Sequence, residues 1–170
     1  MSVKELITVP DDILRKKSEP LNKVDVNEKK LIKDLFETMY HHNGIGLAAV
    51  QVGILKRVVV LDVSKNENEK KPLCFINPQI KTLSEKMSTY EEGCLSIPNT
   101  FIEIERPEIC TVSYIDENGD KKEMKCDGLL STCLQHEINH LDGKLIIDYL
   151  SKIKKDLIIK KLSKQKTSNR

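Results

Sequence analysis

The fold is decided by one segment of the sequence, Gln135-His136-Glu137-Ile138-Asn139-His140-Leu141. Two histidines four residues apart lie on the same face of an α-helix, where both can bind one cation. Glu137 lies beside that face, as a general base must if it is to act on water whose pKa a metal has lowered. The alternative is a core helix in which hydrogen bonds alone hold the two histidines.

The residues around this segment predict a buried helix over 129–141. One side of it is apolar and consists of Leu130, Leu134, Ile138 and Leu141. A second side carries Leu129, Cys133, His136 and His140. A helix with so little purely polar surface is expected to be enclosed by the rest of the fold.

A catalytic metal generally takes three protein ligands, so the third ligand is the informative question. Downstream of His140 the chain has no His and no Glu, and only three aspartates remain there, Asp142, Asp148 and Asp156. Upstream, Cys94 lies in residues 91–98, which Gly93 and Pro98 predict to be an irregular loop able to bring a side chain to a site. Taking Cys94 as the third ligand gives one thiolate and two neutral imidazoles around a divalent ion.

The other cysteines give less reason to expect a ligand. Cys74, Cys110 and Cys126 fall in predicted strands, where cysteine is more often a small buried hydrophobe. Five cysteines at irregular spacings also argue against a disulfide framework and for reduced thiols.

A helix and two strands are predicted before the histidine pair. The helix runs from an N-cap at Asn27 to Asn43-Gly44, with apolar residues at helical spacing, Leu31, Ile32, Leu35, Phe36 and Met39. Residues 57–63 are β-branched and predict a buried strand, and residues 73–76 predict a short strand that ends before Pro78.

A hairpin and a last helix complete the predicted elements. Residues 109–115 and 121–126 flank Asn118-Gly119, whose positive φ angles suit a tight antiparallel turn. From about Ser151 a helix carries its apolar residues on one face, Ile153, Leu157, Ile158 and Leu162. Strands that precede the late helices without regular alternation favour an α+β fold, with mainly antiparallel sheets around a buried metal-binding helix and a helix near each end.

The bulk composition predicts one soluble domain. The chain has 170 residues, of which 39% are hydrophobic and 32% charged, and we expect a catalytic domain over 1–164 with a flexible basic tail over 165–170. No run of about 18 apolar residues predicts a membrane span, and we expect a cytoplasmic protein. Residues 151–170 hold eight basic residues and one acidic residue in a chain of net charge +2, so that end could contact an anionic surface such as RNA.

Three segments in this order resemble the bacterial-type peptide deformylases: residues 44–51 (GIGLAAVQ), 92–96 (EGCLS) and 135–141 (QHEINHL). The resemblance covers about residues 5 to 160. It implies a hydrolase that removes the N-formyl group from the N-terminal methionine of newly synthesised proteins and releases formate. Two positions depart from the common pattern: Asn139 stands where the family commonly has Asp, and Phe101 stands near where many members have Arg.

The resemblance also implies roles for particular residues. Cys94, His136 and His140 would bind Fe2+, with Zn2+, Ni2+ or Co2+ able to replace it. Glu137 would act as general base and then general acid, while the Gln51 side-chain amide and the Leu95 backbone N–H would stabilise the oxyanion. The peptide would add as a strand beside Ile45, Gly46 and Gly93, and its methionine would enter a pocket that includes Glu92, Leu129 and Cys133.

The partners implied are N-formylmethionyl nascent peptides and, through the basic C-terminal helix, the ribosome near its exit tunnel, with the protein a monomer. Two rival hypotheses stay open. One is a metallopeptidase with Asp148 or Asp156 as third ligand, which predicts that Cys94→Ser keeps its metal and its activity. The other is a ribosome- or RNA-binding module in which the metal is only structural.

Overall fold

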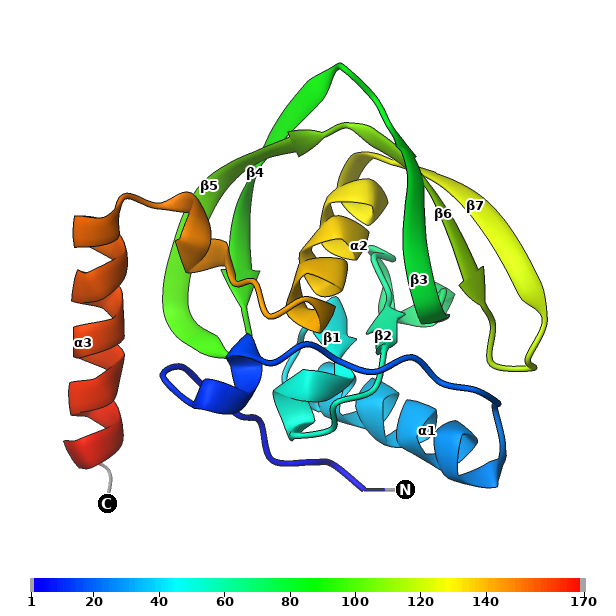
Figure 1. The fold of residues 1–170 in the computed structure, drawn as a ribbon, viewed down its shortest axis with the longest axis horizontal. Helices are drawn as coiled ribbons and strands as arrows, with labels where there is room; N and C mark the ends of the chain where they lie inside the picture. Colours follow the sequence, from blue (N-terminus) through cyan, green and yellow to red (C-terminus); the bar gives the residue numbers. More distant parts are fainter. Residues whose placement is uncertain (1, 169–170) are drawn as a thin grey trace.

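Two antiparallel sheets enclose the helix that contains the histidine pair, in a computed structural model that describes residues 2–168. This helix, α2, spans Gly128–Leu141 and lies at the centre of the molecule (Figure 1). One sheet has the strand order β1-β2-β3-β6-β7, and the other consists of β4 and β5. The predicted α+β fold with a buried helix is confirmed.

The strands and the other two helices have the following bounds. The strands are β1 Gly46–Ala48, β2 Val58–Leu61, β3 Leu73–Leu83, β4 Met87–Cys94, β5 Ile97–Pro107, β6 Ile109–Ile115 and β7 Lys121–Asp127. The helices are α1 Val26–His41 and α3 Lys152–Ser168, and the short 3-10 turns are η1 Asp12–Arg15, η2 Ala49–Val52, η3 Glu67–Glu69 and η4 Ile146–Tyr149. None of the helices in residues 2–168 is both long and apolar enough to cross a membrane.

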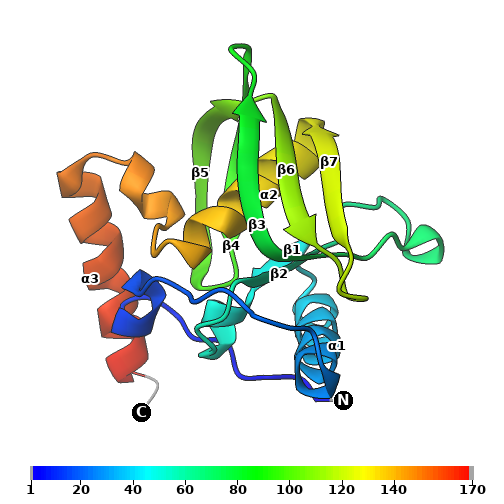
Figure 2. The same cartoon turned by 45° about the vertical axis from the view of Figure 1, so that its right-hand side comes forward.

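The five-stranded sheet has a helix on each face, which explains why β2 is apolar throughout. Val59 and Leu61 belong to the cluster that surrounds α2, whereas Val58 and Val60 pack with Leu35 of α1 on the other face. Successive side chains of a strand point to opposite faces, so a strand covered on both faces has no polar position. Figure 2 shows α1 below the sheet and α2 behind β3 and β6.

Helix α1 begins two residues earlier than the sequence predicted. Its N-cap is Asp25, whose carboxylate accepts hydrogen bonds from the backbone N–H groups of Asn27 and Glu28, and Glu28 completes a capping box. Aspartate and asparagine are equally good N-caps. The glutamate three residues after Asp25 is the feature that distinguishes the two positions, because a capping box needs Glu or Gln there.

Strand β3 continues to Leu83, so the predicted end before Pro78 is wrong. Asn77 has a φ of 50°, and the register with β6 shifts between Ile76 and Gln79. The bulge removes Pro78 from the ladder of backbone hydrogen bonds, where its missing N–H would otherwise leave a gap. The Asn77 side chain bonds the backbone of Leu21 in both directions, at 2.8 Å each, and this holds the bulge.

The expected loop over 91–98 is also wrong, because β4 and β5 form a hairpin there. The register changes within the hairpin: Gly93 pairs with Phe101, but Cys94 pairs with Ile97. Irregularity predicted from Gly93 and Pro98 is therefore confined to a bulge and a tight turn at the end of a regular ribbon.

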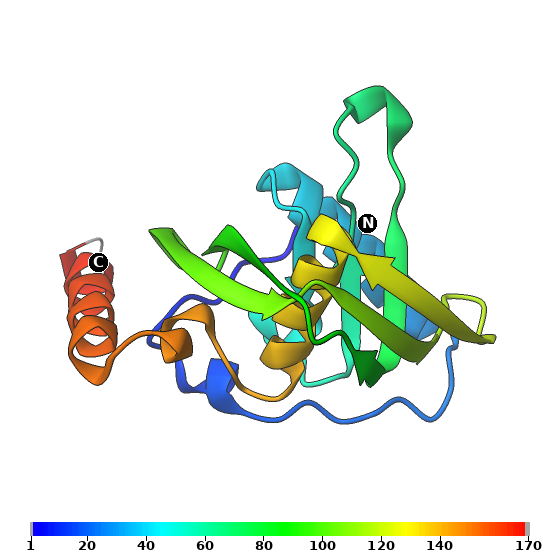
Figure 3. The same ribbon diagram turned by 90° about the horizontal axis from the view of Figure 1, so that it is seen from above.

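Helix α3 lies at one end of the molecule (Figure 3) and ends at Ser168, so residues 165–168, predicted as tail, are helical. Asn169 and Arg170 lie outside the described residues. Leu162 is buried with Leu14 and Ile97, but Ile153 and Leu157 are 75% and 62% exposed. The predicted apolar face is thus only partly covered by the rest of the chain.

Candidate active site

The structure brings together the donor atoms of Cys94, His136 and His140. The Nε2 atom of His140 lies 3.3 Å from Cys94 Sγ and 3.2 Å from His136 Nε2, and one ligand atom from each residue falls within 4.8 Å of the others. Ligands at tetrahedral metal distances lie about 3.3–3.6 Å from one another. The separations and the donor types therefore fit one divalent metal ion.

Each of the three donors comes from an element that fixes its direction. His136 and His140 follow one another by four residues on α2 and are both buried. Cys94 is the last residue of β4, immediately after the register shift at Gly93. A bulge bends its strand and changes where the next side chain points, and here it directs the thiol to α2.

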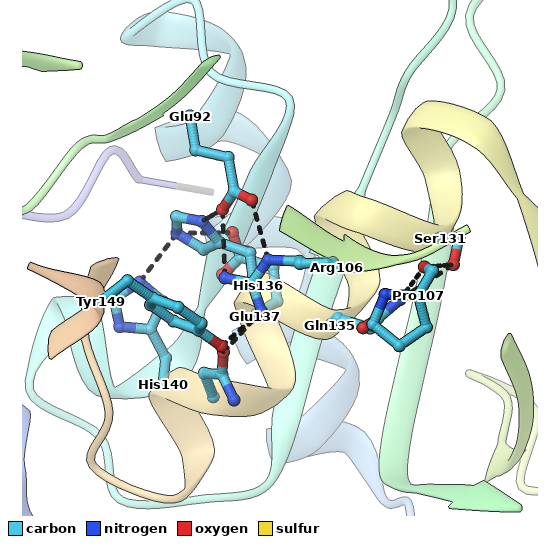
Figure 4. A network of polar contacts seen from close by, with 10 residues as sticks. Glu92, Arg106, Pro107, Ser131, Gln135, His136, Glu137, His140 and Tyr149 are labelled. Carbon is cyan, nitrogen blue, oxygen red and sulfur yellow. Dashed lines mark hydrogen bonds and ion pairs between the residues drawn. The ribbon is translucent and has the colours of Figure 1, made fainter. Parts of the chain in front are cut away.

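A glutamate behind the cluster fixes the tautomer of His136. Glu92 Oε1 lies 2.9 Å from His136 Nδ1 (Figure 4), and a carboxylate there accepts the Nδ1–H. The other ring nitrogen, Nε2, then faces Cys94 and His140, as in metal sites where an outer carboxylate orients a histidine ligand. Burial would raise the pKa of Glu92, but hydrogen bonds from His136 and Arg106 outweigh it, so the pKa is lowered and the side chain stays ionised.

Arg106 holds Glu92 from the other side. Its Nε donates to Oε2 at 2.7 Å and its Nη2 donates to Oε1 at 3.1 Å, and both side chains are almost completely buried. Arg106 also donates to Asn139 Oδ1 at 2.8 Å and to the Tyr149 hydroxyl at 3.1 Å, with the guanidinium 4.9 Å from the Tyr149 ring centre (Figure 4). Asn139, a departure from the family's common pattern, thus keeps an acceptor for Arg106.

The sequence analysis missed Arg106 and Tyr149. Arg106 occupies the inward position that Ile102 and Ile104 occupy earlier on β5, and all three are buried. The sequence did offer a signal for Arg106: it continues the alternating series of apolar, inward-facing positions on this strand. A charged residue at such a position is rarely buried without a partner. Tyr149 gave no signal, because it reaches the network from η4, after the end of α2.

Glu137 is buried beside the cluster, with Oε1 3.9 Å from His136 Nε2. Its Oε2 has no hydrogen-bond partner among the described residues. Burial removes water from the carboxylate and raises its pKa to about 7, which is where a group that both accepts and donates a proton works best near neutral pH. Burial also lowers the pKa of His140 well below its usual value, so this imidazole is neutral as a metal ligand must be.

Gln51 is oriented by the backbone next to it. Its Oε1 accepts from the Ala48 N–H at 2.9 Å, and its Nε2 donates to Ser96 Oγ at 3.0 Å and lies 3.6 Å from Cys94 Sγ. The amide NH2 group is therefore directed to the donor cluster. Leu95 follows Cys94 directly in the chain.

A cavity of about 660 Å³ opens beside the cluster. The residues predicted to contact substrate all line it, namely Ile45, Gly46, Glu92, Gly93, Leu129 and Cys133. Gln51, Cys94, Leu95, His136 and Glu137 line it as well. The cavity extends between β1 and β4. A Cβ at Gly46 would lie 2.7 Å from Glu137 Oε1, so a larger residue there would displace that carboxylate.

The sequence pattern of the polypeptide deformylase family matches residues 3–156. The chain belongs to the peptide deformylase family. It is 55% identical over 168 residues to the peptide deformylase of Pelagibacter ubique, covering 99% of this chain and 98% of that one. It is 51% identical over 164 residues to that of Rhizobium meliloti, covering 96% and 94%.

Solved structures of deformylases have the same fold. A crystal structure of peptide deformylase from Ehrlichia chaffeensis has a TM-score of 0.93 and 43% identity, and the match covers 98% of each chain. A second structure from that organism, in complex with actinonin, has a TM-score of 0.91 and 45% identity, covering 97% of this chain and 98% of that one. This deformylase is therefore a metal-dependent hydrolase that removes the N-formyl group from the N-terminal methionine of newly made proteins.

Proposed function

We propose that Cys94, His136 and His140 bind one ion per chain, Fe2+ in the cell, with Zn2+, Ni2+ or Co2+ able to replace it. The observation that carries this proposal is the meeting of one sulfur and two imidazole nitrogens at ligand spacing, with the His136 tautomer set by Glu92. When bound, the ion supplies a Lewis acid and lowers the pKa of a water molecule in the site. A thiolate with two imidazoles is compatible with each of these ions.

The proposed roles of the other residues follow from where they lie. Glu137 accepts a proton from the attacking water and passes it to the leaving amine, so that the products are formate and a free N-terminus. The Gln51 NH2 group and the Leu95 N–H donate to the developing oxyanion, a contribution of up to about 4 kcal/mol per donor in other acyl-transfer enzymes. The orientation of Gln51 by Ala48 supports this role.

Two strand edges support a backbone grip on the substrate. β1 is an edge of the five-stranded sheet, and β4 pairs with β5 alone in residues 2–168. The cavity passes between Ile45-Gly46 and Gly93 on these edges, so an extended peptide can add as a strand there. Leu129 and Cys133 of α2, with Glu92, then form the methionine pocket.

The first experiment measures formate released from formyl-Met-Ala-Ser by protein purified without oxygen. The wild type is compared with Glu137→Ala, and the metal content of both is determined. We expect the variant to keep its metal and to lose about 10²- to 10⁴-fold in rate, the range contributed by a positioned acid and base. A metal-loaded variant with wild-type rate would refute the role of Glu137, and a metal-loaded wild type that releases no formate would refute the proposed function.

The metallopeptidase alternative is not supported. Asp148, one of its two candidate ligands, bonds Arg15 at 2.7 Å and Lys155 at 2.8 Å, and the other, Asp156, is exposed on α3. We expect Cys94→Ser to lose most of its metal. A Cys94→Ser variant that keeps stoichiometric metal would return the question of the third ligand to these aspartates.

We propose further that the chain acts in the cytoplasm as a monomeric single domain and that α3 binds the ribosome near the exit tunnel. The charge of residues 151–170 and the exposure of Ile153 and Leu157 support this contact. A Lys154→Glu/Lys160→Glu/Lys161→Glu variant should co-sediment with ribosomes less than the wild type, and truncation after Leu150 should abolish co-sedimentation.

The charge-reversal variant separates a deformylase that contacts the ribosome from a pure binding module. It leaves Lys155, and so the Lys155–Asp148 ion pair, in place. We expect it to release formate from the free tripeptide at the wild-type rate. Loss of formate release and of ribosome binding together would instead point to a damaged fold, which a far-UV circular dichroism spectrum would reveal.

A further inference from the structure

Phe101 is an exposed aromatic residue on the wall of the catalytic cavity. It lines the cavity, yet 68% of its surface is exposed. It pairs across the β4–β5 hairpin with Gly93, and Gly93 directly precedes Cys94 in the chain. A Cβ on Gly93 would lie 2.9 Å from Phe101 Cε1, so the ring covers the space where a side chain of residue 93 would be. Gly93 thus allows the ring to lie close to the candidate ligand Cys94.

The alternation of the hairpin places Phe101 on its outer face. Glu92 points inward to His136, and its cross-strand partner Ile102 is buried. The next pair, Gly93 and Phe101, therefore lies on the opposite face. An extended substrate beside β4 alternates in the same way. If its methionine enters the pocket at α2, the side chain of the following residue points outward, where Phe101 is.

The rest of the cavity mouth has an apolar rim, with neither a lysine nor an arginine among the described residues that line it. Two further apolar side chains of the lining, Ile45 and Leu129, are 43% and 37% exposed. Of the three carboxylates that line the cavity, Glu92 and Glu137 are buried, and Glu92 is already paired with Arg106, whereas Glu91 is exposed. An apolar platform favours aromatic and large aliphatic side chains. The exposed Glu91 disfavours an acidic one, because like charges repel.

We propose that Phe101 is a specificity-determining residue that selects an aromatic or large aliphatic side chain directly after the formylmethionine and disfavours an acidic one. The inference rests on the proposed function, since it assumes that formylmethionyl peptides bind in this cavity. To that function it adds a preference among nascent chains, set by the residue after the formylmethionine. Nascent proteins with an apolar second residue are the preferred substrates of this enzyme.

The test compares formyl-Met-Phe-Ser, formyl-Met-Ala-Ser and formyl-Met-Asp-Ser as substrates of the metal-loaded enzyme, with kcat/KM measured by formate release. We expect the wild type to prefer Phe over Ala by about 3- to 10-fold, the range of one aromatic contact. Phe101→Ala should reduce this ratio to about 1, mainly through KM. Phe101→Tyr, which keeps the ring, should retain it, and Phe101→Arg should raise the rate on the Asp peptide relative to Ala.

Leu83→Ala is the matched control, because Leu83 is 52% exposed and does not line the cavity. It should leave all three substrate ratios unchanged. A Phe-to-Ala ratio that is the same in the wild type and in Phe101→Ala overturns the inference, as does a wild type that prefers the Asp peptide. Absence of formate from every peptide overturns the proposed function itself and so is distinguishable from either result.

Discussion

Replacing Arg106 with methionine should destabilise the protein strongly, because it leaves the Glu92 carboxylate buried with too few partners. The two side chains are only 4% and 6% exposed and are joined by two hydrogen bonds. Removing one partner of such a buried pair costs about 3–5 kcal/mol. For a chain of this size, each kcal/mol lowers the melting temperature by about 2–4 °C, so we expect a decrease of roughly 6–20 °C.

The assays are thermal unfolding and urea unfolding of the metal-free protein, since bound metal would add its own binding free energy to the stability of the folded state. The double variant Glu92→Gln/Arg106→Met should recover at least about 1–2 kcal/mol of the loss. It has no unpaired buried charge, and the amide oxygen of the introduced glutamine side chain can still accept from His136 Nδ1–H.

Lys86→Met is the matched control. Lys86 pairs with Glu108 at 3.3 Å but is 78% exposed, so its loss should change stability by under about 0.5 kcal/mol.

Two results would refute this reasoning. A loss below about 1 kcal/mol in Arg106→Met would mean that Glu92 finds water or another partner when Arg106 is removed. A double variant as unstable as the single one would mean that the loss comes from the packing of the arginine side chain and not from an uncompensated charge.

Gly46→Ala should lower kcat at least about 10-fold with little loss of metal. The added Cβ would lie 2.7 Å from Glu137 Oε1 and must displace that carboxylate. Single-turnover formate release measures the effect, and an unchanged rate would contradict the prediction. Burial opposes ionisation of Asp148, but hydrogen bonds from Arg15 and others lower its pKa from 3.8 to about 2. The stabilisation is therefore present above about pH 4 and lost as the pH falls toward 2. After allowance for solvent screening it is about 1 kcal/mol, so the stability advantage of the wild type over Asp148→Asn should shrink by that amount between pH 5 and pH 2 in urea unfolding. Leu134→Ala should cost about 2–5 kcal/mol, since Leu134 is fully buried; a loss under 1 kcal/mol would show that the core closes around the gap.

Local patterns in the sequence were sufficient for the elements whose signals lie within a few residues. The apolar sides of α2 predicted a buried helix, and the Asn118-Gly119 pair predicted the β6–β7 hairpin. Of that pair only Gly119 has a positive φ, 86°, so the positive φ expected at Asn118 is wrong. In both cases the side-chain period or the turn conformation is set by neighbouring residues.

The cluster of Cys94, His136 and His140 was only partly predictable from local sequence patterns. The spacing of His136 and His140 follows from the helix period alone, whereas Cys94 was selected from five cysteines by its glycine- and proline-containing surroundings and by resemblance. The structure places its thiol 3.3 Å from His140 Nε2. The reason is a strand bulge, which the same glycine and proline indicated only as irregularity.

The sequence by itself thus determined the helix that carries the histidines, the fold class and the family. Only the tertiary structure decided what surrounds that helix. Arg106 reaches Glu92 and Asn139 across 14 and 33 residues of chain, and Phe101 covers Gly93 only because the hairpin pairs them. Such contacts depend on strand register and on the packing of separate elements, and neither is encoded in the period of one segment.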